Sequence, residues 1–518
     1  MEAPISSTGS SYQRTNTGEE PMDGLQEDNS TITSIGSVDR AAAQRTLWNF
    51  VFMSVFFSAN HGCVVACLSL ATSRLGSTGA WQSGILYLFY TASALLGATY
   101  VAKSLGARNA IITGMMLYCV YVGCFLLATI SPAIETPAAL FGAGIGGVGA
   151  GFLWTAQGSY FARASEDYSS FMTEEISTST STLASIFAFI YLSAEIVLRS
   201  LSTFLLEAGL DWVVVFAVYT AVTILSTLLM FFVHNYSPES QNEGDDYEIH
   251  QESTEEGLEP NIPVASVYTQ SVFYKVTAAW QLLKMDLKMK YMIPLNAVFA
   301  FAGSFLNSYV NSEVVKQVDN SSTRVGIYNA WVSCVAAGMS LVFGQASKKI
   351  GNGPVLIFGA ICFSGVVLPF LVLPNTADWG VPLLLVVYTF HGTGRATFEG
   401  TLKATFADYF AYEKEGAFAN IILQNGLSGA IGYVLTFTLL CSEESRYCIK
   451  YSDGSLHNVF IFEALVAVTA ILAVAGYLRA SALRRLETIS ASGGQESLHS
   501  DSILIPLAAT NAEDEVQQ

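Results

Sequence analysis

Charged side chains are scarce in this chain. Asp, Glu, Lys and Arg make up 13% of its 518 residues, whereas hydrophobic residues make up 52%. A chain of this composition cannot bury its apolar surface in one soluble core. The sequence also lacks a nucleophile elbow, a phosphate-binding loop and any Cys/His spacing typical of a metal site. We therefore expect no enzyme activity, no cofactor, no metal and no nucleic-acid partner.

Long apolar runs are abundant. A run of about 20 apolar residues can cross a hydrocarbon layer roughly 30 Å thick, and the chain contains twelve such runs. They cover residues 48–70, 82–102, 110–130, 137–160, 179–203, 212–233, 291–311, 325–345, 354–373, 381–404, 417–440 and 457–478. The sequence therefore predicts an all-α polytopic membrane protein, with the lipid bilayer as its main partner.

One short segment occurs twice, after the second apolar run of each half. The two copies share a lysine and two glycines at the same offsets: Lys103, Gly106 and Gly114 in the first, and Lys348, Gly351 and Gly359 in the second. A repeat at corresponding places indicates a duplicated bundle. We expect a six-helix bundle over 47–234, a linker over 235–290 and a second six-helix bundle over 291–480. The polar tails at 1–46 and 481–518 are predicted to be disordered.

The linker between the two bundles changes character along its length. Residues 235–274 are rich in Asp and Glu and contain no Lys or Arg, which is typical of a solvated, disordered segment. The part that follows has apolar residues at helical spacing, including Trp280 and Leu287, with Lys284 beside them. This pattern predicts an amphipathic helix on the inner leaflet. It is either a lid or an anionic-lipid contact, or a linker that docks the second bundle.

Basic residues predict the orientation of the chain. An even number of spans places both termini and the linker on one side, and most of the 24 Lys and Arg residues fall there. The basic residues in loops on the opposite side are Arg74, Lys316, Arg324, Arg446 and Lys450. Because basic loops are retained in the cytoplasm, we predict cytoplasmic termini, in either the plasma membrane or an endomembrane.

Two features of the predicted outer loops agree with this orientation. Asn320 begins an Asn-Ser-Ser glycosylation acceptor, whereas the acceptors at Asn29 and Asn235 fall on the cytoplasmic side and are expected to stay unmodified. Cys441 and Cys448 share one outer loop, where an oxidising compartment would allow a disulfide.

The run over 381–404 carries the most unusual polar residues. His391, Arg395 and Glu399 recur every fourth residue and so share one helical face. An Arg or Glu at mid-membrane costs about 2.5 to 3.5 kcal/mol, so such groups pair and face protein or water. The set is either a buried ion pair that fixes packing or an ion-sensitive or proton-sensitive binding site. Glu195 and Arg199 form a second acid-before-base pair, expected to be structural, with Arg199 extending toward the outer surface.

Three segments resemble the Unc-93-like family, a branch of the major facilitator superfamily. The first is Leu153–Tyr160, similar to the signature Trp-x-Ala-Gln-Gly-x-Tyr. The signature residues are Trp154, Gln157, Gly158 and Tyr160. The other two segments are Leu105–Tyr121 and Lys414–Asn420. The resemblance implies a major facilitator-type bundle of six plus six helices. It also implies a regulator of an ion channel, particularly a potassium channel, or a trafficking escort, with a channel or receptor subunit as partner.

The resemblance also implies where a cavity lies. In a major facilitator fold the first, fourth, seventh and tenth spans line a central cavity. These spans contain polar residues: Asn60, His61, Gln157, Asn307, Asn311, His391, Arg395 and Glu399. Lys103 and Lys348 occupy a position that is acidic in typical superfamily transporters, which favours the regulator. The alternative is a secondary transporter of a small solute or ion through this cavity.

Overall fold

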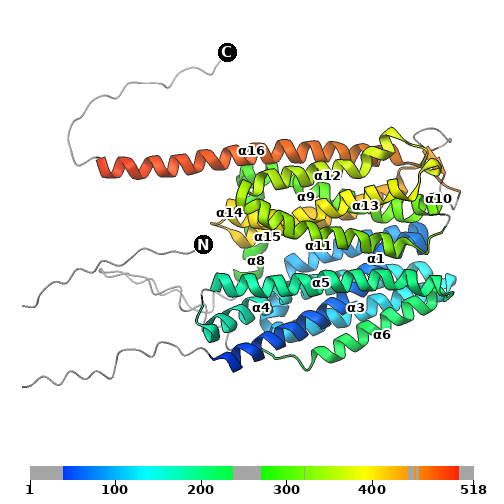
Figure 1. Ribbon diagram of the computed structural model, residues 1–518, viewed down its shortest axis with the longest axis horizontal. Helices are drawn as coiled ribbons and strands as arrows, with labels where there is room; N and C mark the ends of the chain where they lie inside the picture. Colours follow the sequence, from blue (N-terminus) through cyan, green and yellow to red (C-terminus); the bar gives the residue numbers. More distant parts are fainter. Residues whose placement is uncertain are drawn as a thin grey trace, which may run out of the picture.

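Long helices running side by side form the whole bundle (Figure 1). The computed structural model describes residues 39–174, 176–236, 270–319, 321–441, 448–450 and 454–500. The acceptors Asn29 and Asn320, most of the acidic linker, most of the predicted N-terminal tail and residues 501–518 of the predicted C-terminal tail lie outside the described residues. The buried core extends through both halves and includes the fully buried tyrosines Tyr118, Tyr160 and Tyr388.

Spans in the first half of the chain are built from a small number of helices. They are α1 (Arg40–Leu96), α2 (Ala98–Leu105), α3 (Ala107–Ile130), the short η1 (Pro132–Ile134), α4 (Glu135–Met172), α5 (Ile176–Glu207) and α6 (Trp212–Met230).

The second half is more interrupted. Its helices are α8 (Gln270–Met285), α9 (Leu287–Phe305), η4 (Leu306–Val314), α10 (Val315–Asp319), α11 (Val325–Ile350), α12 (Asn352–Val372), η5 (Thr376–Asp378), α13 (Val381–Ala396), η6 (Thr397–Leu402), α14 (Lys403–Tyr409), α15 (Lys414–Thr438) and α16 (Val459–Ser500). The segments η4 and η6 are π-helical.

The helix α1 consists of two spans joined by a sharp turn. Its 57 residues would extend about 85 Å as one straight helix, far more than a bilayer requires. The helical geometry breaks at Gly76, where φ is 54° and ψ is −128°, a conformation that only glycine adopts at low cost. The chain turns back at this point, as the close approach of Gly79 to Ala71 shows: a Cβ atom on Gly79 would lie 2.1 Å from the carbonyl oxygen of Ala71.

Ten described helices are long and apolar enough to cross a membrane, and α1 is one of them. The predicted span over 381–404 is not among the ten, and it is divided into α13, η6 and α14. Counting α1 as two crossings and adding this divided span gives the twelve crossings that the apolar runs predict. The chain is therefore an all-α, polytopic membrane protein.

The repeated segment has the same structure in both halves. Gly106 separates α2 from α3 with φ 77° and ψ 156°, and Gly351 separates α11 from α12 with φ 82° and ψ 170°. Further on, Gly114 lies against α4 and Gly359 lies against η6, so closely that a Cβ atom on either would meet a neighbouring atom within 3 Å. The sequence repeat therefore corresponds to a repeated turn and a repeated helix contact.

The two ends of the bundle differ. The first residues of α1 and the last residues of α16 lie at one end, which we name the terminal end, and the opposite end is the far end (Figure 1). A hairpin of β1 (Cys448–Lys450) and β2 (Leu456–Asn458) lies just before α16 at the far end, with Cys448 opposite Asn458. A disulfide joins Cys441 to Cys448.

Candidate functional site

An ionic network joins the two halves in the middle of the bundle. Arg395 of α13 donates from Nη1 to Glu195 Oε2 at 2.8 Å and from Nη2 to Glu195 Oε1 at 3.0 Å, and Glu195 belongs to α5. The Nε atom of Arg395 donates to Glu399 Oε1 at 2.7 Å. One guanidinium group therefore binds a carboxylate from each half of the chain.

Glu195 has additional partners on α5 and α11. The hydroxyl of Ser333 donates to Glu195 Oε2 at 2.7 Å, and Arg199 Nη2 lies 3.9 Å from the same oxygen. Arg199 also donates from Nη1 to the backbone oxygen of Asn329 at 3.0 Å. The side chain of Glu195 is 1% exposed, whereas that of Glu399 is 32% exposed. Glu399 is therefore the accessible carboxylate of the ionic network, which we define as Glu195, Arg199, Arg395 and Glu399.

The formal charges of the ionic network cancel. A buried charge destabilises a protein unless it is paired and hydrogen-bonded, and each of the four groups has at least one partner of opposite charge. The spacing along α13 predicts the pair of Arg395 with Glu399. Sequence reasoning missed Glu195 as the main partner of Arg395. It also wrongly predicted that Arg199 extends to the outer surface, whereas the structure shows that Arg199 is buried. The sequence signal that could have indicated Glu195 was its own acid-before-base pair with Arg199 inside a span.

Two π-helical segments interrupt the spans beside the network. The segment η6 contains Glu399, and η4 contains Asn307 and Asn311. A π-helical turn is rare, breaks the regular hydrogen-bond ladder and is found frequently at functional sites. Both interruptions therefore fall where the sequence analysis predicts a polar cavity.

Asn311 connects four helical segments on the far side of the network. Its Nδ2 donates to the backbone oxygen of Ser69 at 3.0 Å and to Asn307 Oδ1 at 3.2 Å. Its Oδ1 accepts from Tyr388 Oη at 2.5 Å and from Asn329 Nδ2 at 3.2 Å. Asn311 therefore links η4 to α1, α11 and α13.

His61 lies in a cage of aromatic rings. Its ring centroid is 5.1 Å from that of Trp154, 5.6 Å from Tyr191, 5.7 Å from Tyr118 and 6.0 Å from Phe57. Glu195, Arg199 and Arg395 of the ionic network act on it electrostatically. Its Nδ1 atom is buried and has no hydrogen-bond partner among the described residues. Trp154 of the sequence signature therefore contributes to the surroundings of a buried imidazole.

His391 has similar surroundings in the other half. Its ring lies 6.0 Å from Phe363 and 6.3 Å from Phe299, which stacks on Phe398 at 3.9 Å. Within the described part of the chain, neither ring nitrogen of His391 has a hydrogen-bond partner. The site therefore has unused hydrogen-bonding capacity on one imidazole from each half.

Other residues of the predicted cavity lie elsewhere or make no described polar contact. Asn60 donates from Nδ2 to the backbone oxygen of Thr223 at 3.1 Å and to Thr227 Oγ1 at 3.0 Å, both on α6. Its Nδ2 also lies 3.9 Å from Cys119 Sγ on α3. Asn60 therefore connects α1 to α3 and α6 inside the first half, and no hydrogen bond joins it to the network among the described residues.

The remaining signature residues continue along α4 toward the terminal end. Gln157 is buried and Gly158 is exposed. Tyr160 packs its ring against Tyr236 at 4.9 Å. The structure thus places Tyr160 outside the ionic network.

The two halves also meet directly at the far end, between α5 and α11. Thr203 Oγ1 donates to the backbone oxygen of Thr323 and accepts from the backbone N–H of Ile327, each at 3.0 Å. A Cβ atom on Gly326 would lie 2.1 Å from Ser202 Oγ. Each hydrogen bond between the halves described in this section lies either at the ionic network or between the network and the far end. On the other side of the network, Gly400 and Lys403 are exposed.

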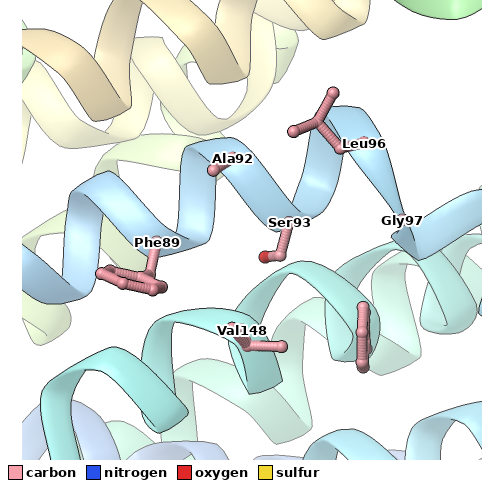
Figure 2. Close-up of a pocket in the computed structure, with 7 residues that line it drawn as sticks. Phe89, Ala92, Ser93, Leu96, Gly97 and Val148 are labelled. Atoms are coloured by element: carbon pink, nitrogen blue, oxygen red, sulfur yellow. The ribbon is translucent and has the colours of Figure 1, made fainter. Parts of the chain in front are cut away.

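A separate apolar notch lies between α1 and α4. Figure 2 shows Phe89, Ser93 and Leu96 of α1 beside Val148 of α4. The notch contains no residue of the ionic network. No group of three His, Cys, Asp or Glu among the described residues could hold a metal ion. We therefore assign the candidate site to the ionic network and the two histidines beside it.

Solved structures of several transporters have the same fold. The nucleoside transporter NupG, as a variant, superposes with a TM-score of 0.59 at 12% identity, covering 83% of this chain and 99% of that one. The xylose transporter XylE from E. coli, in a partially occluded inward open conformation, gives 0.55 at 13% identity and covers 85% and 97%. A peptide transporter of the POT type, bound to alafosfalin, gives 0.57 at 12% identity and covers 87% and 99%.

Sequence comparison gives the family. No curated protein matches the chain. The family model of the major facilitator superfamily matches residues 47–433 and, in a second match, 292–507. This match spans well over half of the chain but does not point to the Unc-93-like branch in particular. The chain belongs to the major facilitator superfamily.

Proposed function

We propose that this protein is a secondary transporter that moves a small solute by alternating rearrangement of its two halves. The observation that carries the proposal is the pairing of Glu195 with Arg395 across the two halves. The transporters that share the fold support it. The regulator or escort hypothesis, with a channel or receptor subunit as partner, rests on the sequence resemblance alone.

The ionic network allows the ion pair between Glu195 and Arg395 to form and break. Glu195 has Arg199 in its own half, and Arg395 has Glu399 in its own half. When the halves separate, each group keeps an oppositely charged neighbour, so neither buried charge is left unpaired. Two arrangements of similar energy are what a two-state rearrangement requires.

The hydrogen bonds named above between the halves lie at the network or toward the far end, and this favours a state that is open toward the terminal end. Thr203 closes the far end through Thr323 and Ile327, whereas Glu399 and Lys403 are accessible on the other side of the network. We propose that the solute reaches the network from the terminal end. If the basic-loop rule holds, this end faces the cytoplasm.

Unused hydrogen-bonding groups and aromatic rings favour a solute with both polar and apolar surface. His61 and His391 have unpaired ring nitrogens among the described residues, and Trp154 and Tyr191 border His61 with partly exposed rings. Because the charges within the ionic network balance one another, the network itself offers no uncompensated charge to bind an ion. This composition supports transport of an organic solute over transport of an inorganic ion.

Flux through purified protein in liposomes tests the proposal. The panel contains radiolabelled uridine, xylose and a dipeptide, which represent the solute classes of the transporters with the same fold. We expect uptake of at least one class, and a loss of at least tenfold in Glu195→Gln and in Arg395→Gln. Glu207→Gln is the control, because Glu207 forms an exposed pair with Arg324. Absence of flux for every solute, or uptake unaffected by both network variants, would overturn the proposal.

A further inference from the structure

The helix α8 is fixed to the bundle by one face. The amide of Asn420 on α15 donates to the backbone oxygen of Ala279 at 2.9 Å. A Cβ atom on Gly416 would lie 3.1 Å from the backbone carbon of Ala278. Ala278, Ala279 and Leu282 are buried. The structure therefore shows α8 docked on the second half, which is one of the two interpretations that the sequence allows for this helix.

The opposite face of α8 is exposed and amphipathic. Trp280 is 64% exposed and Met285 is 78% exposed, and Leu287, at the start of α9, is 54% exposed. Lys284, and Lys290 in the first turn of α9, are also exposed, and neither side chain forms an ion pair or hydrogen bond with any residue that the structure describes. We name these five residues the α8 face. The docking contacts of α8 do not account for this exposed combination of large apolar side chains and lysines.

The direction of α8 determines how deep in a membrane the α8 face would lie. α8 runs across the direction of the spanning helices and bridges the two halves near the terminal end (Figure 1). It is followed directly by α9, which begins after the N-cap Asp286. A helix that lies across the ends of the spans is held at the boundary between hydrocarbon and headgroups. Trp is enriched at that boundary, and Lys can extend from it toward headgroups.

The charge of the α8 face selects among lipids. The basic residues Lys284 and Lys290 carry no acidic partner among the described residues, and the acidic group nearest in sequence, Asp286, instead contacts Lys288 and the hydroxyl of Tyr412. A lysine near an anionic leaflet contributes binding equivalent to about a fivefold preference. The zwitterionic headgroup of phosphatidylcholine offers no such net attraction.

We propose that the α8 face is a binding surface for anionic phospholipids in the leaflet at the terminal end of the bundle. Trp280, Met285 and Leu287 enter the region between headgroups and acyl chains, and Lys284 and Lys290 contact the anionic phosphates. Because α8 is hydrogen-bonded to α15 and directly precedes α9, bound lipid stabilises the docking of α8 on the second half. The inference does not depend on solute transport.

Quenching of tryptophan fluorescence by brominated lipid tests the proposal. The full-length protein is reconstituted into nanodiscs of phosphatidylcholine containing 20% of either 6,7-dibromo-phosphatidylglycerol or 6,7-dibromo-phosphatidylcholine. Subtracting the signal of Trp280→Phe from that of the natural protein isolates Trp280. We expect stronger quenching of Trp280 by the brominated anionic lipid than by the brominated zwitterionic lipid.

Lysine variants separate charge recognition from simple proximity to lipid. Removing Lys284 and Lys290 together, as Lys284→Gln with Lys290→Gln, is expected to abolish the excess quenching by the anionic lipid. The control removes the same charge elsewhere, as Lys348→Gln with Lys349→Gln, and is expected to retain it.

Three results would overturn the proposal. Equal quenching of Trp280 by both brominated lipids would show no anionic preference. Absence of quenching by either lipid would place the α8 face in the aqueous phase, where a soluble protein is the alternative occupant. Equal effects of the two lysine pairs would assign the preference to overall charge.

Discussion

Arg395 Nη1 and Nη2 bind the two carboxylate oxygens of Glu195, although the two residues lie 200 positions apart and in different halves of the chain. The contact is bidentate, a geometry that lysine cannot reproduce. It therefore requires α5 and α13 to hold one defined relative position in this state.

Removing the acid of this pair should destabilise the protein. Glu195→Gln leaves Arg395 buried with Glu399 as its remaining acid, and we expect a loss of about 3 kcal/mol in the free energy of unfolding, the low end for breaking a buried pair. Thermal unfolding in detergent micelles measures the effect. The double variant Glu195→Gln with Arg395→Gln should lose less than the sum of the two single variants. Strict additivity of the single variants would contradict this prediction.

Adding a side chain at Gly326 should separate the halves at the far end. A Cβ atom there would meet Ser202 Oγ at 2.1 Å and the backbone oxygen of Arg199 at 2.3 Å, so Gly326→Ala should force α5 and α11 apart. We expect a cysteine placed at Thr203 to react faster with a water-soluble maleimide in this background. Gly338→Ala on the same helix is the control, because nothing lies within 4 Å of its Cβ position. The prediction fails if both variants give the same labelling rate.

Substitution of Gly76 should impair formation of the turn within α1. Gly76 has φ 54° and ψ −128°, and holding a residue with a Cβ atom in such a region costs about 1 to 3 kcal/mol. We expect Gly76→Ala to lower the melting temperature and the yield of folded protein. Gly123→Ala lies within α3 with open space at its Cβ position and should be neutral or mildly stabilising. Equal melting temperatures of the two variants would contradict the assigned turn.

The disulfide between Cys441 and Cys448 provides a test of orientation. It lies at the far end, before α16, which the basic-loop rule places outside the cytoplasm. After mild reduction of intact cells, a membrane-impermeant maleimide should label this pair, and the label should disappear in Cys441→Ser with Cys448→Ser. The test uses cells in which surface biotinylation detects the protein at the plasma membrane. Labelling of the pair there only after the membrane is permeabilised would reverse the predicted orientation.

Much of the fold was readable from the sequence because hydrophobic length is a local property. Twelve apolar runs predict twelve crossings, and the repeat of Lys103 to Gly114 at Lys348 to Gly359 predicts related halves. Periodicity could not show that two of the crossings are joined by a single sharp turn at Gly76, or that π-helical segments interrupt two others. Those details depend on backbone geometry that single residues do not encode.

The candidate site was predictable only in part. Spacing along one helix predicts that Arg395 pairs with Glu399, and both the i,i+4 pairs in the spans are visible in the sequence. Sequence alone gave no reason to join Glu195 to Arg395, nor to direct Asn60 toward α6. Partners in different helices are chosen by how the helices pack.

The sequence by itself determined that this chain is a membrane bundle with two related halves, because lipid selects long apolar helices and a repeat in the chain produces a repeat in space. Only the tertiary structure decided which charges meet. The free energy of a buried ion pair depends on the distance and orientation of groups from separate helices, and these are set when α5, α11 and α13 pack against one another.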